Sequence, residues 1–149
     1  MLLNACGGPS NGRHTASPSS CIGTANCVQV KVAGDVSGGL ITSLPVSGFT
    51  DCSTPSGSST VWLGDIFGTL SGRAWEMVVE VLKYDGPRSY SAAFSLSPSP
   101  SDNSQTYSGN GTLDLHEGAH SGTVEAVLSN PTNHSKVVRV DGSFNCRSS

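Results

Sequence analysis

The sequence of 149 residues is poor in charge and has no long apolar run. Charged residues make up 13% of it, about half the usual share of ~25%. No stretch of about 18 consecutive apolar residues occurs, so the sequence predicts no membrane-spanning helix. The 18 glycines and 8 prolines, together with the sparse charge, argue against a coiled coil or a helical bundle. With eight Lys and Arg residues against eleven Asp and Glu residues, we expect no nucleic-acid partner.

The first 20 residues differ in composition from the rest of the chain. Residues 7–20 are rich in Gly, Pro and Ser and contain no aromatic residue, whereas all nine aromatic residues lie from Phe49 onward. This composition is typical of a flexible tether. We therefore expect a tether over residues 7–20 and one domain over residues 21–149. A compact chain of about 150 residues buries roughly 70% of its surface, which is enough for a real core.

The cysteines are odd in number: Cys6, Cys21, Cys27, Cys52 and Cys146. None of them forms a C-x-x-C pair, so the spacing of a zinc ribbon is absent. If Cys6 is set apart, the other four suit two disulfides in an oxidising compartment, with three possible pairings. We favour Cys52 with Cys146 and Cys21 with Cys27, because the long bridge would tie the end of the domain to its beginning.

Residues 1–6, Met-Leu-Leu-Asn-Ala-Cys, resemble the lipobox of bacterial lipoproteins, L-x-[AGS]-C. In that family the cysteine of the motif carries the lipid and becomes the mature N-terminus. The resemblance implies that Cys6 is the lipidation site and that residues 1–6 are the remnant of a lipoprotein signal. It also implies that the membrane is a partner of this chain through an N-terminal lipid.

Alternating apolar residues on both sides of Asp85-Gly86 predict a β-hairpin. A two-residue turn at this pair would place Val79 opposite Ala92. One face of the hairpin is then apolar, and the other is largely polar. The apolar face would hold eight side chains, namely Trp75, Met77, Val79, Val81, Tyr90, Ala92, Phe94 and Leu96.

The same alternation recurs near both ends of the expected domain. Val28, Val30 and Val32 alternate with polar residues, and the pattern returns over residues 138–146. Gly142 interrupts this last run and indicates a bulge or a close approach of another strand. Several short strands with turn signals every 8–12 residues predict an all-β fold. We expect an antiparallel β-sandwich, or a partly open barrel, of about seven to eight strands.

Residues 116–120, His-Glu-Gly-Ala-His, match the zinc-protease signature H-E-x-x-H. That chemistry needs a helix, which places both imidazoles on one face to bind zinc while the glutamate acts on the metal-bound water. The flanking residues alternate with period two instead, and a type II′ turn at Gly118-Ala119 pairs Leu113 with Val124. We therefore expect a hairpin and no metal site. The alternative is a small zinc-dependent hydrolase that uses His116, Glu117 and His120.

Aromatic side chains raise a second alternative, a carbohydrate-binding module, because exposed rings can stack on sugars. Trp75 and Tyr90 belong to the apolar face of the predicted hairpin and are expected in the core. The remaining candidates for ligand binding are Trp62, Tyr84 and Tyr107.

Roughly the last 65 residues resemble the ending of small bacterial surface lipoproteins of the mycobacterial 19 kDa antigen type. The resemblance rests on Y-D-G-P-R-S-Y, on S-G-T-V-E-A and on the closing V-D-G-S-F-N-C. It implies an exported, disulfide-containing β-sandwich, displayed from a lipid anchor at the outer face of the cell membrane or in the cell envelope. It also implies no enzymatic activity, and we expect no cofactor. The function expected from the sequence is that of a binding module for an unknown protein or glycan ligand.

Overall fold

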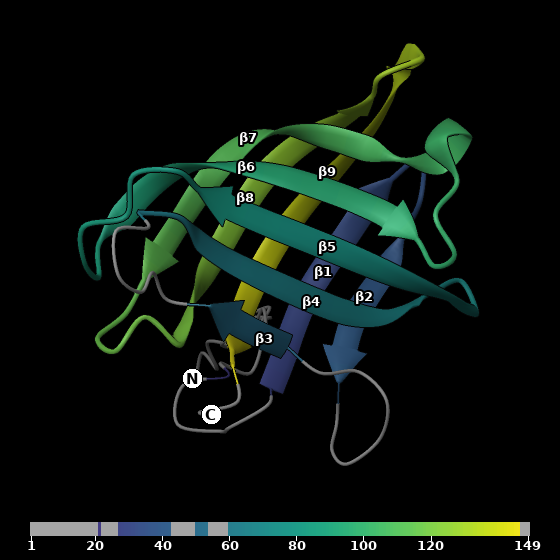
Figure 1. Ribbon diagram of the computed structural model, residues 1–149. Helices are drawn as coiled ribbons and strands as arrows, with labels where there is room; N and C mark the ends of the chain where they lie inside the picture. Colours follow the sequence, from purple (N-terminus) through teal and green to yellow (C-terminus); the bar gives the residue numbers. More distant parts are fainter. Residues whose placement is uncertain (1–20, 22–26, 43–49, 54–59, 147–149) are drawn as a thin grey trace, which may run out of the picture.

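The computed structural model describes Cys21 and residues 27–42, 50–53 and 60–146, with only the backbone described for residues 41–42 and 50–53. In these ranges nine strands form one antiparallel sheet, and one 3₁₀ helix, η1 (Asn103–Gln105), precedes β7. The strands, labelled in Figure 1, are β1 (Cys27–Gly34), β2 (Gly38–Thr42), β3 (Thr50–Ser53), β4 (Trp62–Leu70), β5 (Arg73–Val81), β6 (Ser89–Pro98), β7 (Tyr107–Leu115), β8 (Ser121–Asn130) and β9 (Asn133–Asn145). The all-β antiparallel fold predicted from the alternation is confirmed, with nine strands where seven to eight were expected. Residues 1–6 and 7–20, the expected signal remnant and tether, lie outside the described residues.

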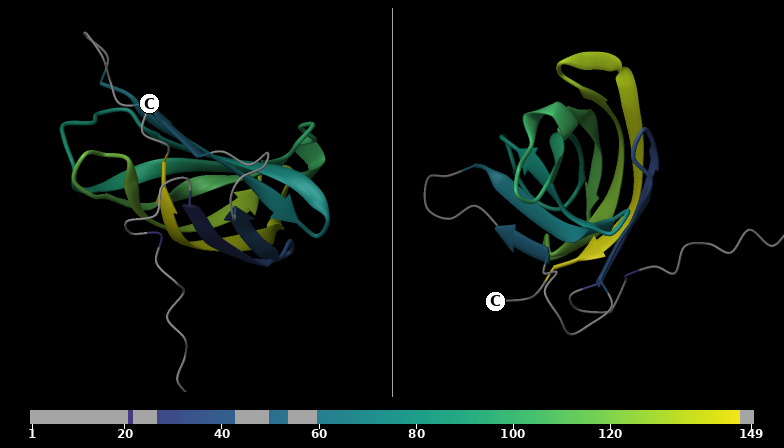
Figure 2. Two further views of the ribbon diagram at one scale, coloured as in Figure 1. Left: turned by 90° about the horizontal axis from the view of Figure 1, so that it is seen from below. Right: turned by 90° about the vertical axis from the view of Figure 1, so that its right-hand side faces the viewer.

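The sheet curls into a nearly closed barrel. Its strand order is β2-β1-β9-β8-β7-β6-β5-β4-β3, so the chain runs up and down from β3 to β9, and β1 then pairs with β9. β2 packs against β4, where a Cβ on Gly68 would lie 2.9 Å from the Cα atom of Leu40. Next to this contact, Ser71 Oγ donates to the carbonyl of Ser37 at 3.3 Å. Of the two architectures expected, the structure is therefore the barrel, and the right-hand view of Figure 2 shows its curvature.

Every second side chain along most strands faces the barrel interior. On β5 and β6 these are the eight residues of the predicted apolar face, each at most 8% exposed. The largest fully buried side chains come from strands far apart in the chain, with Trp62 on β4, Tyr107 on β7 and Phe144 on β9. Full burial of one large apolar side chain contributes roughly 1.5–3 kcal/mol, so this interior is the main source of stability.

The register of the β5–β6 hairpin differs from the prediction by two residues. Val79 pairs with Phe94 and not with Ala92, because a longer loop between the strands replaces the expected two-residue turn. The hydroxyl of Tyr90 folds this loop by accepting from the Asp85 N–H at 3.1 Å. A shift of two residues keeps every side chain on its own face of the sheet. The predicted core was therefore right although the predicted pairing was wrong.

The interruption at Gly142 is a close approach, as expected. Gly142 on β9 lies opposite Val30 of β1 and Val124 of β8. Its φ is 156°, and a Cβ at this position would collide with the carbonyl oxygen of Gln29. The glycine therefore lets β9 pair closely with both of its neighbours at this point.

Candidate functional site

The barrel has two ends, and the predicted site residues are divided between them. Four features meet at what we call the Trp62 end, namely the first residue of β4, the β5–β6 loop (82–88), the β7–β8 loop (116–120) and Cys146. The opposite end, which we call the Tyr107 end, is formed by the start of β7, the end of β8 and the turn after β1.

The H-E-x-x-H residues form a loop between two strands, as predicted. β7 and β8 pair Leu113 with Val124, in the register expected from the sequence. The His116 N–H donates to the carbonyl of Ser121 at 2.9 Å, which continues the ladder up to the loop. Residues 116–120 therefore do not form the helical turn on which the zinc-protease arrangement depends.

The turn in this loop lies one residue earlier than predicted. The Ala119 N–H donates to the carbonyl of His116 at 3.0 Å, so Glu117 and Gly118 are the central residues. Gly118 has a φ of 82°, which suits the third position of a type II turn. The predicted type II′ turn at Gly118-Ala119 is wrong because Ala119, with a left-handed φ of 55°, is instead buried at the end of the barrel.

Ala119 closes the Trp62 end. Its side chain is 1% exposed, and its carbonyl accepts a hydrogen bond from Trp62 Nε1 at 3.1 Å. The Cys146 N–H donates to the carbonyl of His120 at 2.6 Å, which fastens the loop to the end of β9. The ring of Trp62 also lies 6.2 Å from that of Phe144. The motif residues thus close the barrel through their backbone carbonyls.

The side chains of the motif do not converge on a common point. Within the described ranges, no group of three or more His, Cys, Asp and Glu residues could hold a metal ion. Glu117 is exposed, and Nδ1 of His120 is buried without a hydrogen-bond partner. The zinc-hydrolase alternative therefore lacks the helix that would bring His116 and His120 together.

The three candidate aromatic residues do not share a surface. Trp62 is fully buried and Tyr107 is 2% exposed, and they lie at opposite ends of the barrel. Tyr84 is partly buried in the β5–β6 loop, where its ring lies 5.9 Å from that of Tyr90. Burial, and then the charges of Tyr90 and Asp85, raise the pKa of the Tyr84 hydroxyl. These three residues do not form the stacking surface of the carbohydrate-binding alternative, because Trp62 and Tyr107 belong to the core.

Tyr107 closes the other end with a buried phenol. Its hydroxyl donates to the carboxylate of Asp35, in the turn between β1 and β2. Its ring lies 6.5 Å from that of Trp75. Burial and the hydrogen bond to Asp35 raise the pKa of Tyr107 to about 12. The phenol therefore stays neutral and remains a hydrogen-bond donor throughout the physiological pH range.

The disulfide predicted between Cys21 and Cys27 is present. Cys146 is disulfide-bonded as well. Its predicted partner, Cys52, lies on β3, where the side chains are outside the described part of the structure, so this pairing stays a prediction. Cys6, the predicted lipidation site, also lies outside the described residues.

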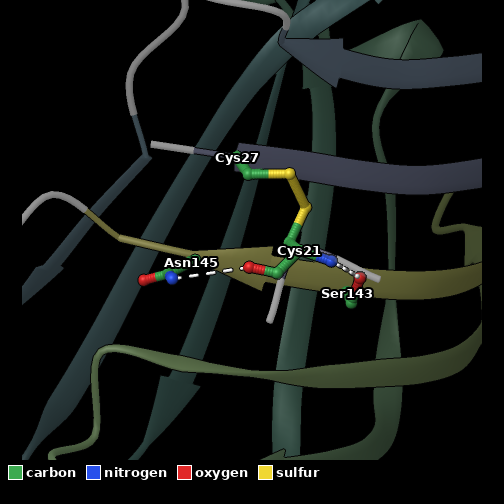
Figure 3. The surroundings of a disulfide bond; sticks show 4 residues. All are labelled: Cys21, Cys27, Ser143 and Asn145. Atoms are coloured by element: carbon green, nitrogen blue, oxygen red, sulfur yellow. Dashed lines mark hydrogen bonds between the residues drawn. A yellow bond between two sulfur atoms is a disulfide. The ribbon is translucent and has the colours of Figure 1, made fainter. Parts of the chain in front are cut away.

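Cys21 lies on the outer face of the barrel, against β9 (Figure 3). Its N–H donates to Ser143 Oγ at 3.2 Å, and its carbonyl accepts from Asn145 Nδ2 at 3.4 Å. Ser143 and Asn145 alternate with the inward-facing Phe144, which puts Cys21 outside the sheet. The disulfide joins it to Cys27, the first residue of β1. We call this disulfide and these two hydrogen bonds the N-terminal clamp.

A polar hollow that was not singled out from the sequence lies next to the clamp. It is a cavity of about 340 Å³ on the outer face of β7, β8 and β9. Gly142 lies in it, and its polar side chains are Thr112, Asp114, Thr123, Glu125, Asp141 and Ser143. Because these residues alternate along three strands, the period-two pattern of the sequence could have placed them on one face. Ser143 belongs both to this outer hollow and to the clamp.

No protein-family model, curated protein or solved structure matches this chain. In the described part of the chain, no helix has the length and apolar character needed to cross a membrane. The resemblance to small surface lipoproteins stays a prediction.

Proposed function

We propose that the chain is an exported lipoprotein of the bacterial cell envelope, held at the membrane by a lipid on Cys6. The observation that supports this most directly is the N-terminal clamp, because it fixes the point at which residues 1–20 join the barrel. In a lipid-anchored protein this attachment point sets how the barrel is held relative to the membrane. The lipobox-like residues 1–6 supply the candidate attachment for the lipid.

The disulfides support export. Cys21 is bonded to Cys27, and Cys146 is disulfide-bonded too. Disulfides form and persist in oxidising compartments outside the cytosol. Because one acyl chain gives only marginal and reversible membrane binding, durable anchoring would need at least two chains on Cys6.

The barrel would act as a non-enzymatic binding module for an external protein or glycan. Its interior holds its own large side chains, among them Trp62, Tyr107 and Phe144, so the ligand would contact the outer surface. The outer hollow offers three carboxylates and three hydroxyls at one place. Carboxylates accept hydrogen bonds, and hydroxyls both donate and accept them, so this lining suits the hydroxyl or amino groups of a ligand.

Mass spectrometry of the protein from the membrane fraction tests the anchor. We expect a lipid-modified peptide at Cys6, and we expect the Cys6→Ser variant to lose its membrane association. The matched control is Cys21→Ser, which opens the clamp and should leave the protein in the membrane fraction. An unmodified N-terminus together with a purely soluble product would contradict the anchor.

Arrays of glycans and of peptides test the binding role. For any ligand that they identify, we expect the double variant Asp114→Asn, Asp141→Asn in the outer hollow to weaken binding about thirtyfold, since the loss of charge at two hydrogen-bond acceptors, at roughly 1 kcal/mol each, amounts to about 2 kcal/mol. The control is Glu76→Gln, Glu80→Gln on the outer face of β5, which should bind normally. Equal binding by both double variants would show that the outer hollow is not the binding surface.

Metal analysis after refolding in zinc tests the hydrolase alternative. We expect no stoichiometric zinc, because residues 116–120 form a loop and not a helix. One zinc ion per chain that is lost in the His116→Ala variant would contradict the non-enzymatic assignment.

A further inference from the structure

Two polar hollows lie next to each other on the outer face of the barrel. The outer hollow, of about 340 Å³, lies over β7, β8 and β9, and a second hollow of about 400 Å³ lies over β6 and β7. The exposed side chains of this second hollow are Ser89, Ser91, Asn110 and Thr112. Thr112 lines both hollows, so together they form one surface, which we call the polar trough.

The trough crosses four neighbouring strands, which are labelled in Figure 1. The ladders place Thr112 of β7 between Ser91 of β6 and Glu125 of β8. Glu125 in turn lies opposite Asp141 of β9. Because neighbouring strands are about 4.8 Å apart, this row of four side chains is about 14 Å long. A row of this length suits a chain-like ligand that lies across the strands.

The carboxylates of the trough are open to a ligand. In the part of the chain that the structure describes, Asp114 and Asp141 have neither an ion pair nor a side-chain hydrogen bond. Glu125 has only an exposed contact of 3.8 Å with Arg139. By contrast, Asp102 near the Tyr107 end accepts three hydrogen bonds from its own loop. The chain thus satisfies that carboxylate itself and leaves those of the trough free to bind other groups.

The two hollows of the trough differ in charge. The outer hollow contains three carboxylates, and two cations lie at its border, Arg139 beside Glu125 and Lys31 opposite Asp141. The remaining excess of negative charge favours a cationic ligand group over an anionic one. The second hollow has hydroxyls and one amide but no charged side chain. A ligand that fills both hollows therefore needs hydroxyl groups along its length and amino groups at the carboxylates.

We propose that the polar trough binds a short oligosaccharide of amino sugars, laid across β6, β7, β8 and β9. Its ammonium groups donate to Asp114 and Asp141, and its hydroxyls bond to Ser91, Asn110 and Thr112. This inference rests on the binding role proposed above for the outer hollow and adds the class of the ligand.

The lining of the trough fits a sugar chain better than a protein partner. The centres of protein interfaces are enriched in aromatic side chains and depleted in charged ones. The trough has the opposite character, because Tyr90, the only aromatic residue that lines it, is 8% exposed and belongs to the barrel core. A ligand with many hydroxyls matches this lining group by group.

Calorimetric titration of the unlipidated full chain at pH 6 tests the ligand class. The probes are β-1,4-linked tetramers of glucosamine, glucose and glucuronic acid, together with the glucosamine dimer. We expect the glucosamine tetramer to bind at least tenfold more tightly than the glucose tetramer, and the glucuronic acid tetramer to bind most weakly, because their charges differ at the carboxylates. Absence of binding, or equal binding of the three tetramers, would overturn the proposal.

The variant Asp114→Asn, Asp141→Asn tests the role of the carboxylates. Asparagine keeps a hydrogen-bonding side chain of the same shape and loses the charge. We expect the glucosamine tetramer to bind about thirtyfold more weakly, while binding of the glucose tetramer stays within about threefold of the wild type. Equal losses for both tetramers would overturn the proposal, because the carboxylates would then not recognise the amino groups.

The variant Ser91→Ala, Asn110→Ala tests whether the second hollow extends the site. We expect the glucosamine tetramer to lose about tenfold in affinity, while the dimer binds as it does to the wild type. The matched control is Ser95→Ala, Ser108→Ala, a cross-strand pair on the same two strands that lies outside both hollows, and it should bind both ligands normally. Equal behaviour of the two variants would overturn the extended site.

These outcomes are distinguishable from a failure of the proposed function. If the oligosaccharides do not bind but a peptide from the arrays does, and if that peptide needs Asp114 and Asp141, the amino-sugar assignment is wrong and the binding role of the outer hollow stands. The anchor at Cys6 does not enter these measurements, because the protein is unlipidated.

Discussion

The two ends of the barrel are closed by different kinds of hydrogen bond. At the Trp62 end a neutral indole N–H meets the backbone carbonyl of Ala119, and no titrating group takes part in that bond. At the Tyr107 end a phenol donates to the carboxylate of Asp35, so that bond depends on the phenol keeping its proton. The comparison teaches that one barrel can combine a closure that is indifferent to pH with one that is not.

The Tyr107 end also contains Asn130, a fully buried polar residue. Its Nδ2 donates to the carbonyls of Ser104 and Thr106 at 2.9 and 3.0 Å. Its Oδ1 accepts from the N–H groups of Thr132 and Asn133, each at 2.9 Å. The Tyr107 end is therefore held by directed hydrogen bonds, whereas a packed aromatic ring dominates the Trp62 end. Substitutions at the Tyr107 end should therefore destabilise the fold by removing hydrogen-bond partners, and substitutions at the Trp62 end should do so by leaving a cavity.

The largest effect is expected from Trp62→Ala, which removes the volume at the Trp62 end. Loss of a buried tryptophan leaves a cavity, and we expect the free energy of unfolding to fall by about 4 kcal/mol in urea denaturation. Trp62→Phe is the control, because it keeps an aromatic ring and loses the N–H to Ala119, and it should cost about half as much. A cost below 1 kcal/mol for Trp62→Ala would show that this end is not closed by packing.

The next largest effect is expected from Asn130→Ala, which removes the partners at the Tyr107 end. Two carbonyls and two N–H groups lose their hydrogen bonds to the buried Asn130 side chain, and we expect a loss of about 3 kcal/mol in the same assay. Asn130→Asp keeps the acceptor oxygens and loses the Nδ2 donor, so it separates the two halves of the network. Equal stability of Asn130→Ala and the wild type would contradict this prediction, because it would mean that water replaces all four hydrogen bonds to Asn130.

Local alternation predicted which residues are buried on β5 and β6 because that pattern depends only on neighbours in the sequence. It did not predict the pairing, since the β5–β6 loop is folded by contacts that no local pattern records. The Tyr84 N–H donates to the carbonyl of Thr60 at 2.8 Å, and the Tyr90 hydroxyl bonds to Asp85. These contacts lengthen the loop and move the register by two residues.

The candidate site was predictable only where its partners are close in sequence. Cys21 and Cys27 are six residues apart, and their pairing was expected correctly. Trp62 and Ala119 are 57 residues apart, and Tyr107 and Asp35 are 72 apart. Both aromatic residues are bonded to partners that lie far away in the sequence. Local patterns could not show these contacts, so Trp62 and Tyr107 were predicted as candidates for ligand binding.

A smaller and pH-dependent effect is expected from Tyr107→Phe, which removes only the hydroxyl. A hydrogen bond to a charged group contributes roughly 1.5–3 kcal/mol, so we expect a loss of about 2 kcal/mol at pH 7. Folding raises the pKa of Tyr107 from 10.0 to about 12, so the contribution is fully present below pH 10 and is lost as the pH rises toward 12. Urea denaturation at several alkaline pH values should show the two proteins converging in this range.

The titration itself gives an independent check on the Tyr107 end. Phenolate absorbance at 295 nm should show one tyrosine ionising near pH 12 in the wild type, and this step should be missing in Tyr107→Phe. Trp62→Phe serves as the comparison, because its stability loss should be the same at pH 7 and at pH 11. A pH-independent loss for Tyr107→Phe would mean that the bond to Asp35 does not form.

The smallest effect is expected from Arg88→Ala, at the exposed rim of the Trp62 end. Arg88 Nε lies 2.8 Å from Asp85 Oδ1, and its guanidinium lies over the ring of Tyr90 at 5.0 Å, but the two charged side chains are 58% and 62% exposed. Exposed ion pairs contribute roughly 0–1 kcal/mol and are weakened by salt. We expect a small loss of stability, seen as a fall in Tm of about 2 °C at low salt and a smaller one in 1 M NaCl. A loss as large as that of Tyr107→Phe would show that charge, and not packing alone, also holds the Trp62 end, and the contrast between the two ends would disappear.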